Sequence, residues 1–168
     1  MIRSKFIEAS ADRLRASAGI LRPPIPLDDL ARHLAVRVLR GASLRPRARG
    51  AYDPVSRTIL LASLGARAER FTLGHELGHL ALDHGGACSF EGEPSVGSFA
   101  LEDADVRIDE EAEADDFSGR LLVPRAWLRD RVKTMSRDEL LDSFDVNLPV
   151  LLIAAERYRL LNQISLGG

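Results

Sequence analysis

The sequence has little or none of the features that are typical of disulfide-bonded, membrane-bound or strongly charged proteins. Its single cysteine, Cys88, cannot form an internal disulfide. No apolar run is long enough for a membrane span, and the first residues lack the continuous apolar stretch of a secretory signal. The formal net charge is −2, so overall charge does not indicate a nucleic-acid binder. We therefore expect a cytoplasmic protein without membrane attachment.

What is present is typical of a folded domain. The 168 residues are 45% hydrophobic and 29% charged, and no internal repeat or low-complexity linker interrupts them. Apolar residues at helical spacing predict helices, and short β-branched or apolar runs predict strands. The predicted helices cover residues 2–18, 28–36, 66–82 and 109–122, and the predicted strand and hairpin cover residues 36–40 and 48–62.

The C-terminal segment reads as two or three short helices after Arg125. Ser136 and Glu139 have the spacing of a capping box at one helix start. The segment has a helix-turn-helix-like shape, but it offers Arg157, Arg159 and few other side chains for reading bases, so we expect its apolar residues to pack. We predict an α+β fold with a first domain over residues 1–125 and a packed C-terminal helical segment over residues 126–168.

The strongest motif is HELGH, which runs from His75 to His79 and matches H-E-x-x-H. Residues four apart share a helical face, so both imidazoles can reach one metal ion. Glu76 lies about 100° around the helix, close enough to act on a metal-bound water without ligating the metal. Zinc with nitrogen ligands and an open position is typical of catalytic sites, so we predict one Zn²⁺ and Glu76 as the catalytic base.

A third ligand is predicted from the helix over residues 109–122. Glu111 and Asp115 are four residues apart, so Glu111 can complete the site while Asp115 accepts a hydrogen bond from a liganding histidine. Glu110 and Glu113 fit less well, because the residues four positions after them cannot orient a histidine. Gly74 and Gly78 lie on one stripe, which predicts a close approach by a neighbouring element.

The order of four segments resembles that of the ImmA/IrrE metallopeptidases: PIPLDDLARHL, GAYDPVSRTILLA, ERFTLGHELGHLALDH and EEAEADDFSGRLLVP. The resemblance covers roughly residues 20–125. It implies a zincin-like fold with gluzincin-type ligands His75, His79 and Glu111 and the catalytic glutamate Glu76. Asp115 stands where many relatives have asparagine, and either side chain can accept a hydrogen bond.

The resemblance also implies a substrate. Members of the family cleave a helix-turn-helix repressor and so switch on stress-response, mobile-element or phage-defence genes. We expect the same of this chain. The alternative from another class is a non-proteolytic sensor, in which the metal stabilises a module that binds a regulator or DNA.

Two further features have open interpretations. Cys88 follows a glycine pair, and it is either an inhibitory fourth metal ligand, as in a cysteine switch, or an incidental small residue. The arginines at 37, 40, 45, 47 and 49 are either a solvated face or a contact for DNA or single-stranded DNA as an activating signal, with Arg45, Arg47 and Arg49 as the candidates. His33 is interpreted as a surface residue and His84 as a helix-end residue off the ligand face.

Overall fold

The computed structural model describes the backbone of residues 3–84 and 101–164 and the side chains of residues 3–84 and 109–164. Within these residues it has a mixed α+β architecture, which confirms the predicted class. The elements in chain order are α1 (Ser4–Ser17), α2 (Leu27–His33), β1 (Arg37–Arg40), β2 (Gly50–Asp53), β3 (Thr58–Leu61), α3 (Ala66–Ala81), α4 (Leu101–Leu122), α5 (Arg125–Arg131), α6 (Arg137–Phe144), α7 (Leu148–Arg157) and the 3-10 turn η1 (Leu161–Gln163).

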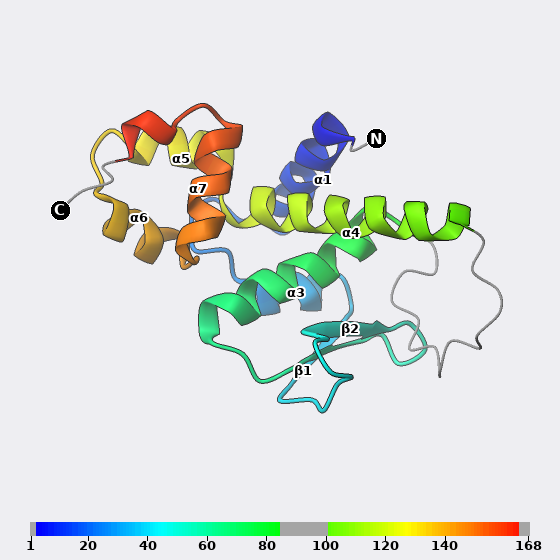
Figure 1. Cartoon of the computed structure of the whole chain (residues 1–168). Helices are drawn as coiled ribbons and strands as arrows, with labels where there is room; N and C mark the ends of the chain where they lie inside the picture. The colour runs from blue at the N-terminus through cyan, green and yellow to red at the C-terminus, as the bar shows by residue number, and fades with distance from the viewer. Residues whose placement is uncertain (1–2, 85–100, 165–168) are drawn as a thin grey trace.

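The three strands form one small sheet in the order β1-β3-β2. β2 pairs antiparallel with β3, as the predicted hairpin requires, and β1 pairs parallel with β3. The hairpin turn is closed by Asp53, whose carboxylate accepts hydrogen bonds from the Val55 amide at 3.0 Å and the Ser56 hydroxyl at 2.5 Å. Because the strand order is β1-β3-β2, β2 is an edge strand. It lies beside α3 (Figure 1).

The helices α3 and α4 pack along each other and form the centre of the molecule, with α1 against the far side of α4 (Figure 1). Their close approach depends on two glycines of α3. A Cβ at Gly74 would lie 2.4 Å from Ser118 Oγ, and one at Gly78 would lie 3.2 Å from the carbonyl oxygen of Ala114. The predicted close approach is confirmed, and it brings the metal-binding motif against the acidic helix.

The helices α5, α6 and α7 gather at one end of the α3–α4 pair (Figure 1). The predicted capping box is present, because Ser136 and Glu139 bond each other's backbone amides. Leu140, Phe144 and Leu151 are fully buried and belong to the same apolar core as Ile7 of α1 and Leu77 of α3. The C-terminal helices thus share one core with the rest of the chain.

Helix boundaries differ from the prediction at three points, and only the start of α4 lies far from the predicted residue. α4 begins at Leu101 instead of Asp109, because residues 101–108 contain neither glycine nor proline to stop a helix. α3 ends at Ala81, before the glycine pair, because Asp83 takes a left-handed conformation with φ of 54°. α2 is shorter than predicted and ends at His33.

Candidate metal centre

Two histidines of α3 and one glutamate of α4 meet at a single point. The Nε2 atoms of His75 and His79 are 3.0 Å apart. Glu111 spans both, with Oε2 at 3.1 Å from His75 Nε2 and Oε1 at 3.3 Å from His79 Nε2. Among the described residues these three form a group that could hold a metal ion. The arrangement follows from the i, i+4 spacing on α3 and from the close packing of α4.

The separations fit a metal ion. Nitrogen and oxygen ligands at zinc distances, in tetrahedral geometry, lie about 3.3 Å from one another. The three side chains show separations of 3.0 to 3.3 Å, close to this value. Two imidazoles and one carboxylate are also the donor set of a catalytic zinc site with an open position. The residues present therefore fit one zinc ion.

His75 is oriented from the solvent side of the site. Its Nδ1–H donates to Asp115 Oδ1 at 2.8 Å, which directs Nε2 toward the shared point. Burial alone lowers the pKa of His75, but the hydrogen bonds to Asp115 and Glu111 outweigh it and raise that pKa to about 10. The hydrogen bonds from His75 and His79 lower the pKa of Glu111. Asp115 thus lies where the sequence predicted a histidine-orienting acceptor.

His79 is oriented by residues that the sequence interpretation set aside. Its Nδ1 lies 3.0 Å from Nδ1 of His84, and Nε2 of His84 lies 3.2 Å from Oε2 of Glu113. Arg3 donates to the same carboxylate at 2.6 and 3.1 Å. The Arg3 hydrogen bond holds the pKa of Glu113 near about 2, although burial opposes it. A chain of polar contacts, buried from His79 to Glu113, therefore runs to the exposed Arg3 at the N-terminal end of α1.

His84 lies at the helix end, and neither His84 nor Glu113 belongs to the metal-capable group, as the sequence interpretation had it, but that interpretation missed their contacts for one geometric reason. It placed His84 on a continued helix, about 140° away from the ligand face. The left-handed turn at Asp83 reverses the chain, and His84 N bonds the carbonyl of His79 at 3.1 Å. The ring of His84 then folds back onto His79. Glu113 orients a histidine too, through His84 and not through a residue of its own helix.

Glu76 lies on α3 beside the ligands, and its side chain is buried. It packs beneath the edge strand β2, where a Cβ at Gly50 would lie only 2.7 Å from Glu76 Oε1. Thr72 fills the adjacent space at 2.8 Å from the same position. Gly50 was not singled out from the sequence, yet its missing side chain lets the strand approach the carboxylate.

The metal centre opens into a cleft of about 540 Å³. Its wall includes Arg47, Arg49 and Phe71 together with the ligands, Glu76 and Asp115. Arg47 and Arg49 are exposed, as is Arg45, whereas Arg40 forms ion pairs with Asp28 and Glu69. Two of the three predicted nucleic-acid contacts therefore line the rim of this cleft. Their binding to nucleic acid stays a prediction.

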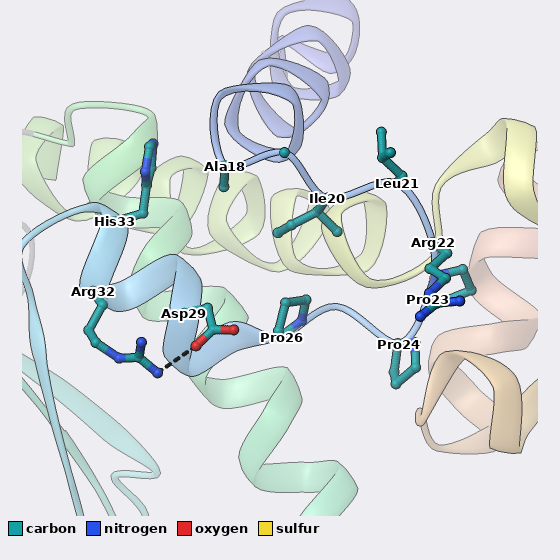
Figure 2. Close-up of a pocket in the computed structure, with 11 residues that line it drawn as sticks. Ala18, Ile20, Leu21, Arg22, Pro23, Pro24, Pro26, Asp29, Arg32 and His33 are labelled. Carbon is teal, nitrogen blue, oxygen red and sulfur yellow. Dashed lines mark hydrogen bonds and ion pairs between the residues drawn. The ribbon is translucent and has the colours of Figure 1, made fainter.

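A second hollow, of about 690 Å³, lies along the loop between α1 and α2 (Figure 2). Its side chains include Ile20, Leu21 and three prolines, and Arg32 pairs with Asp29 beside it. His33 is exposed there and contacts Ser17 Oγ at 3.0 Å. The hollow contains none of the predicted site residues. Cys88, the predicted inhibitory ligand, lies outside the described residues.

The fold and these residues define an α+β domain with a candidate metal centre between two packed helices. The family model Peptidase_M78, described as the IrrE N-terminal-like domain, matches residues 31–160. The chain therefore belongs to this family, which confirms the resemblance read from the sequence.

Comparison with solved structures supports the fold. A Mycobacterium tuberculosis transcriptional regulator matches with a TM-score of 0.62 and 18% identity, over 88% of this chain and 45% of that chain. This chain thus spans less than half the length of that protein. No curated protein matches the sequence. Among the helices that the structure describes, none has the length and apolar character needed to cross a membrane.

Proposed function

We propose that the chain is a zinc-dependent endopeptidase with a zincin-like catalytic unit. The observation that carries the proposal is the convergence of His75, His79 and Glu111 to separations of 3.0 to 3.3 Å beside the buried Glu76. The family supports a metallopeptidase in general terms. The three side chains would hold one zinc ion, and an open position toward the cleft would receive a water and the substrate.

In this proposal, the zinc supplies Lewis acidity that makes the attacking water more acidic and the scissile carbonyl more electrophilic. Glu76 takes the proton of that water and delivers it to the leaving amine. The edge strand β2 packs over Glu76 and fixes its carboxylate at the floor of the cleft. Asp115 and His84 orient the two histidines, so their Nε2 lone pairs face the ion.

We further propose that the substrate is a helix-turn-helix transcriptional repressor. Cleavage would release stress-response, mobile-element or phage-defence genes from repression. The support is the family, together with the likeness in fold to a protein named as a transcriptional regulator. Both connect this fold with regulation of transcription.

The test is co-expression with candidate helix-turn-helix repressors from the same genome. The wild type is expected to cleave one of them, and Glu76→Gln is expected to leave that repressor intact while still binding one zinc per chain. Mass spectrometry of the products and metal analysis of the purified variants give the two readouts. Cleavage by Glu76→Gln at the wild-type rate would remove Glu76 from the mechanism.

The second candidate is a non-proteolytic module whose metal stabilises a surface for a regulator or DNA. The exposed Arg47 and Arg49 at the cleft rim support this candidate, because they are basic side chains that could contact DNA or a regulator. It predicts that the repressor binds and stays uncleaved by the zinc-loaded wild type. The same co-expression experiment therefore separates the two candidates.

A further inference from the structure

A groove of about 890 Å³ lies between α3, α4 and α7. Each helix contributes one face to it. Phe71 comes from α3, Ala112 from α4, and Val150 and Ile153 from α7. Ile153 is 56% exposed, although it is a large apolar residue, and Val150 is half-buried. The groove is thus larger than the metal cleft, and its α7 wall shows apolar side chains to solvent.

The groove and the metal cleft are parts of one surface. Arg49, Phe71 and Asp115 line both. Asp115 also contacts Nδ1 of the ligand His75 at 2.8 Å, so the groove begins directly behind a ligand of the candidate metal centre. A polypeptide whose scissile bond lies at the metal passes from the cleft into the groove within a few residues, because an extended chain advances about 3.3 Å per residue.

The charged groups at the far end of the groove are already paired. Asp116 accepts from Arg120 at 2.9 Å and from Arg157 at 2.6 Å. Arg120 also pairs with Glu8 at 3.1 Å, so two carboxylates match the two guanidinium groups and leave the groove no strong net charge for a nucleic acid or a charged peptide segment. What the groove offers is apolar surface from Phe71, Val150 and Ile153, which favours burial of apolar side chains.

We infer that this groove binds apolar side chains of the substrate chain on one side of the scissile bond, and so selects where the substrate is cut. The inference rests on the proposed peptidase function and adds a substrate class to it. The preferred substrate carries a large aliphatic or aromatic residue within a few positions of the cleavage site. The groove makes α7, from the C-terminal segment, part of the substrate-binding surface.

The experiment uses the helix-turn-helix repressor that the co-expression test identifies as cleaved, with its cleavage site determined by mass spectrometry. Each large apolar residue within four positions of that site is replaced in turn by Asp. One replacement is expected to raise KM by about tenfold with little change in kcat, because a lost apolar side chain in a pocket costs about that much. Ile153→Arg is expected to raise KM for the unmodified substrate similarly.

The decisive combination is Ile153→Arg with the Asp-substituted substrate. An ion pair across the groove is expected to lower KM again, close to the value of the wild type with the unmodified substrate. Val55→Arg is the matched control, since Val55 is a 95% exposed aliphatic residue in the β2–β3 turn and lines neither the groove nor the cleft. Val55→Arg should leave KM unchanged for both the unmodified and the Asp-substituted substrate.

The outcomes separate the groove from the peptidase. Cleavage with KM unaffected by Ile153→Arg, or without rescue by the charge pair, would overturn the groove inference and leave the proposed function standing. Absence of cleavage by the zinc-loaded wild type would remove both. A change of oligomeric state in Ile153→Arg, measured by size-exclusion chromatography with light scattering, would assign the groove to a second copy of the chain and overturn the inference.

Discussion

The two histidines of the candidate metal centre are held in opposite ways. Both histidines contact Glu111, but Nδ1 of His75 contacts Asp115, whose side chain is 61% exposed. Nδ1 of His79 contacts His84, and His84 in turn contacts Glu113. The side chains of His84 and Glu113 are 2% and 6% exposed. The first support lies in the open cleft, where solvent and substrate reach it. The second lies in the interior and connects to α1 through Arg3. The partner of His75 Nδ1 is thus exposed, whereas the partners that orient His79 are buried.

The largest effect is expected from breaking the buried support. His84→Phe removes the partner of His79 Nδ1 and leaves Glu113 with Arg3 alone. Zinc affinity should fall by about 100-fold, and the Tm of the metal-free protein by roughly 5 °C. Competition with a chromogenic chelator and thermal unfolding measure the two. His33→Phe is the matched control, because His33 is exposed and away from the centre. Equal effects of both variants would deny His84 its orienting role.

A smaller effect is expected from breaking the exposed support. Asp115→Ala frees Nδ1 of His75 for water, which replaces much of the lost hydrogen bond. Zinc affinity should fall by about tenfold, with the Tm of the metal-free protein nearly unchanged. The same chelator competition and unfolding curves apply. A loss of affinity as large as that of His84→Phe would erase the contrast between the two histidines.

The smallest expected effect is a change in the number of protons released when zinc binds. Below its raised pKa of about 10, metal-free His75 is protonated, and a liganding imidazole is neutral, so zinc uptake at pH 7.5 must displace that proton. Zinc affinity should therefore rise with pH through this range and level off above pH 10. Asp115→Asn weakens the hydrogen bond that raises this pKa, so zinc binding to the variant should release fewer protons than the roughly one expected of the wild type. Calorimetry in buffers of different ionisation enthalpy counts them. Equal release from both proteins would contradict the role of Asp115.

The sequence predicted those parts of the centre that depend on helical periodicity. His75 and His79 share a face by their spacing, and so do Glu111 and Asp115, so local geometry was enough to propose both sets. A close approach by some neighbouring element was predicted from Gly74 and Gly78, and the structure shows that this element is α4. The hairpin was predicted because Asp53 and Pro54 mark its turn.

The remaining features depend on contacts that periodicity does not encode. His84 meets His79 because the backbone at Asp83 leaves the helix, and a helical wheel cannot show this reversal. Glu113 is paired with Arg3 across 110 residues, which no local pattern reveals. Gly50 matters through its distance to Glu76, on a different element. An aspartate followed by histidine at a helix end was the available signal for the reversal.

The close contact between Gly50 and Glu76 restricts which side chains position 50 can carry. The edge strand and the buried acid compete for the same volume, so a methyl group added to the strand would displace the carboxylate without altering any group that meets the ion. Any larger residue at position 50 would therefore have to shift both the Glu76 carboxylate and the Thr72 methyl group, so glycine keeps the strand and the acid in their present places.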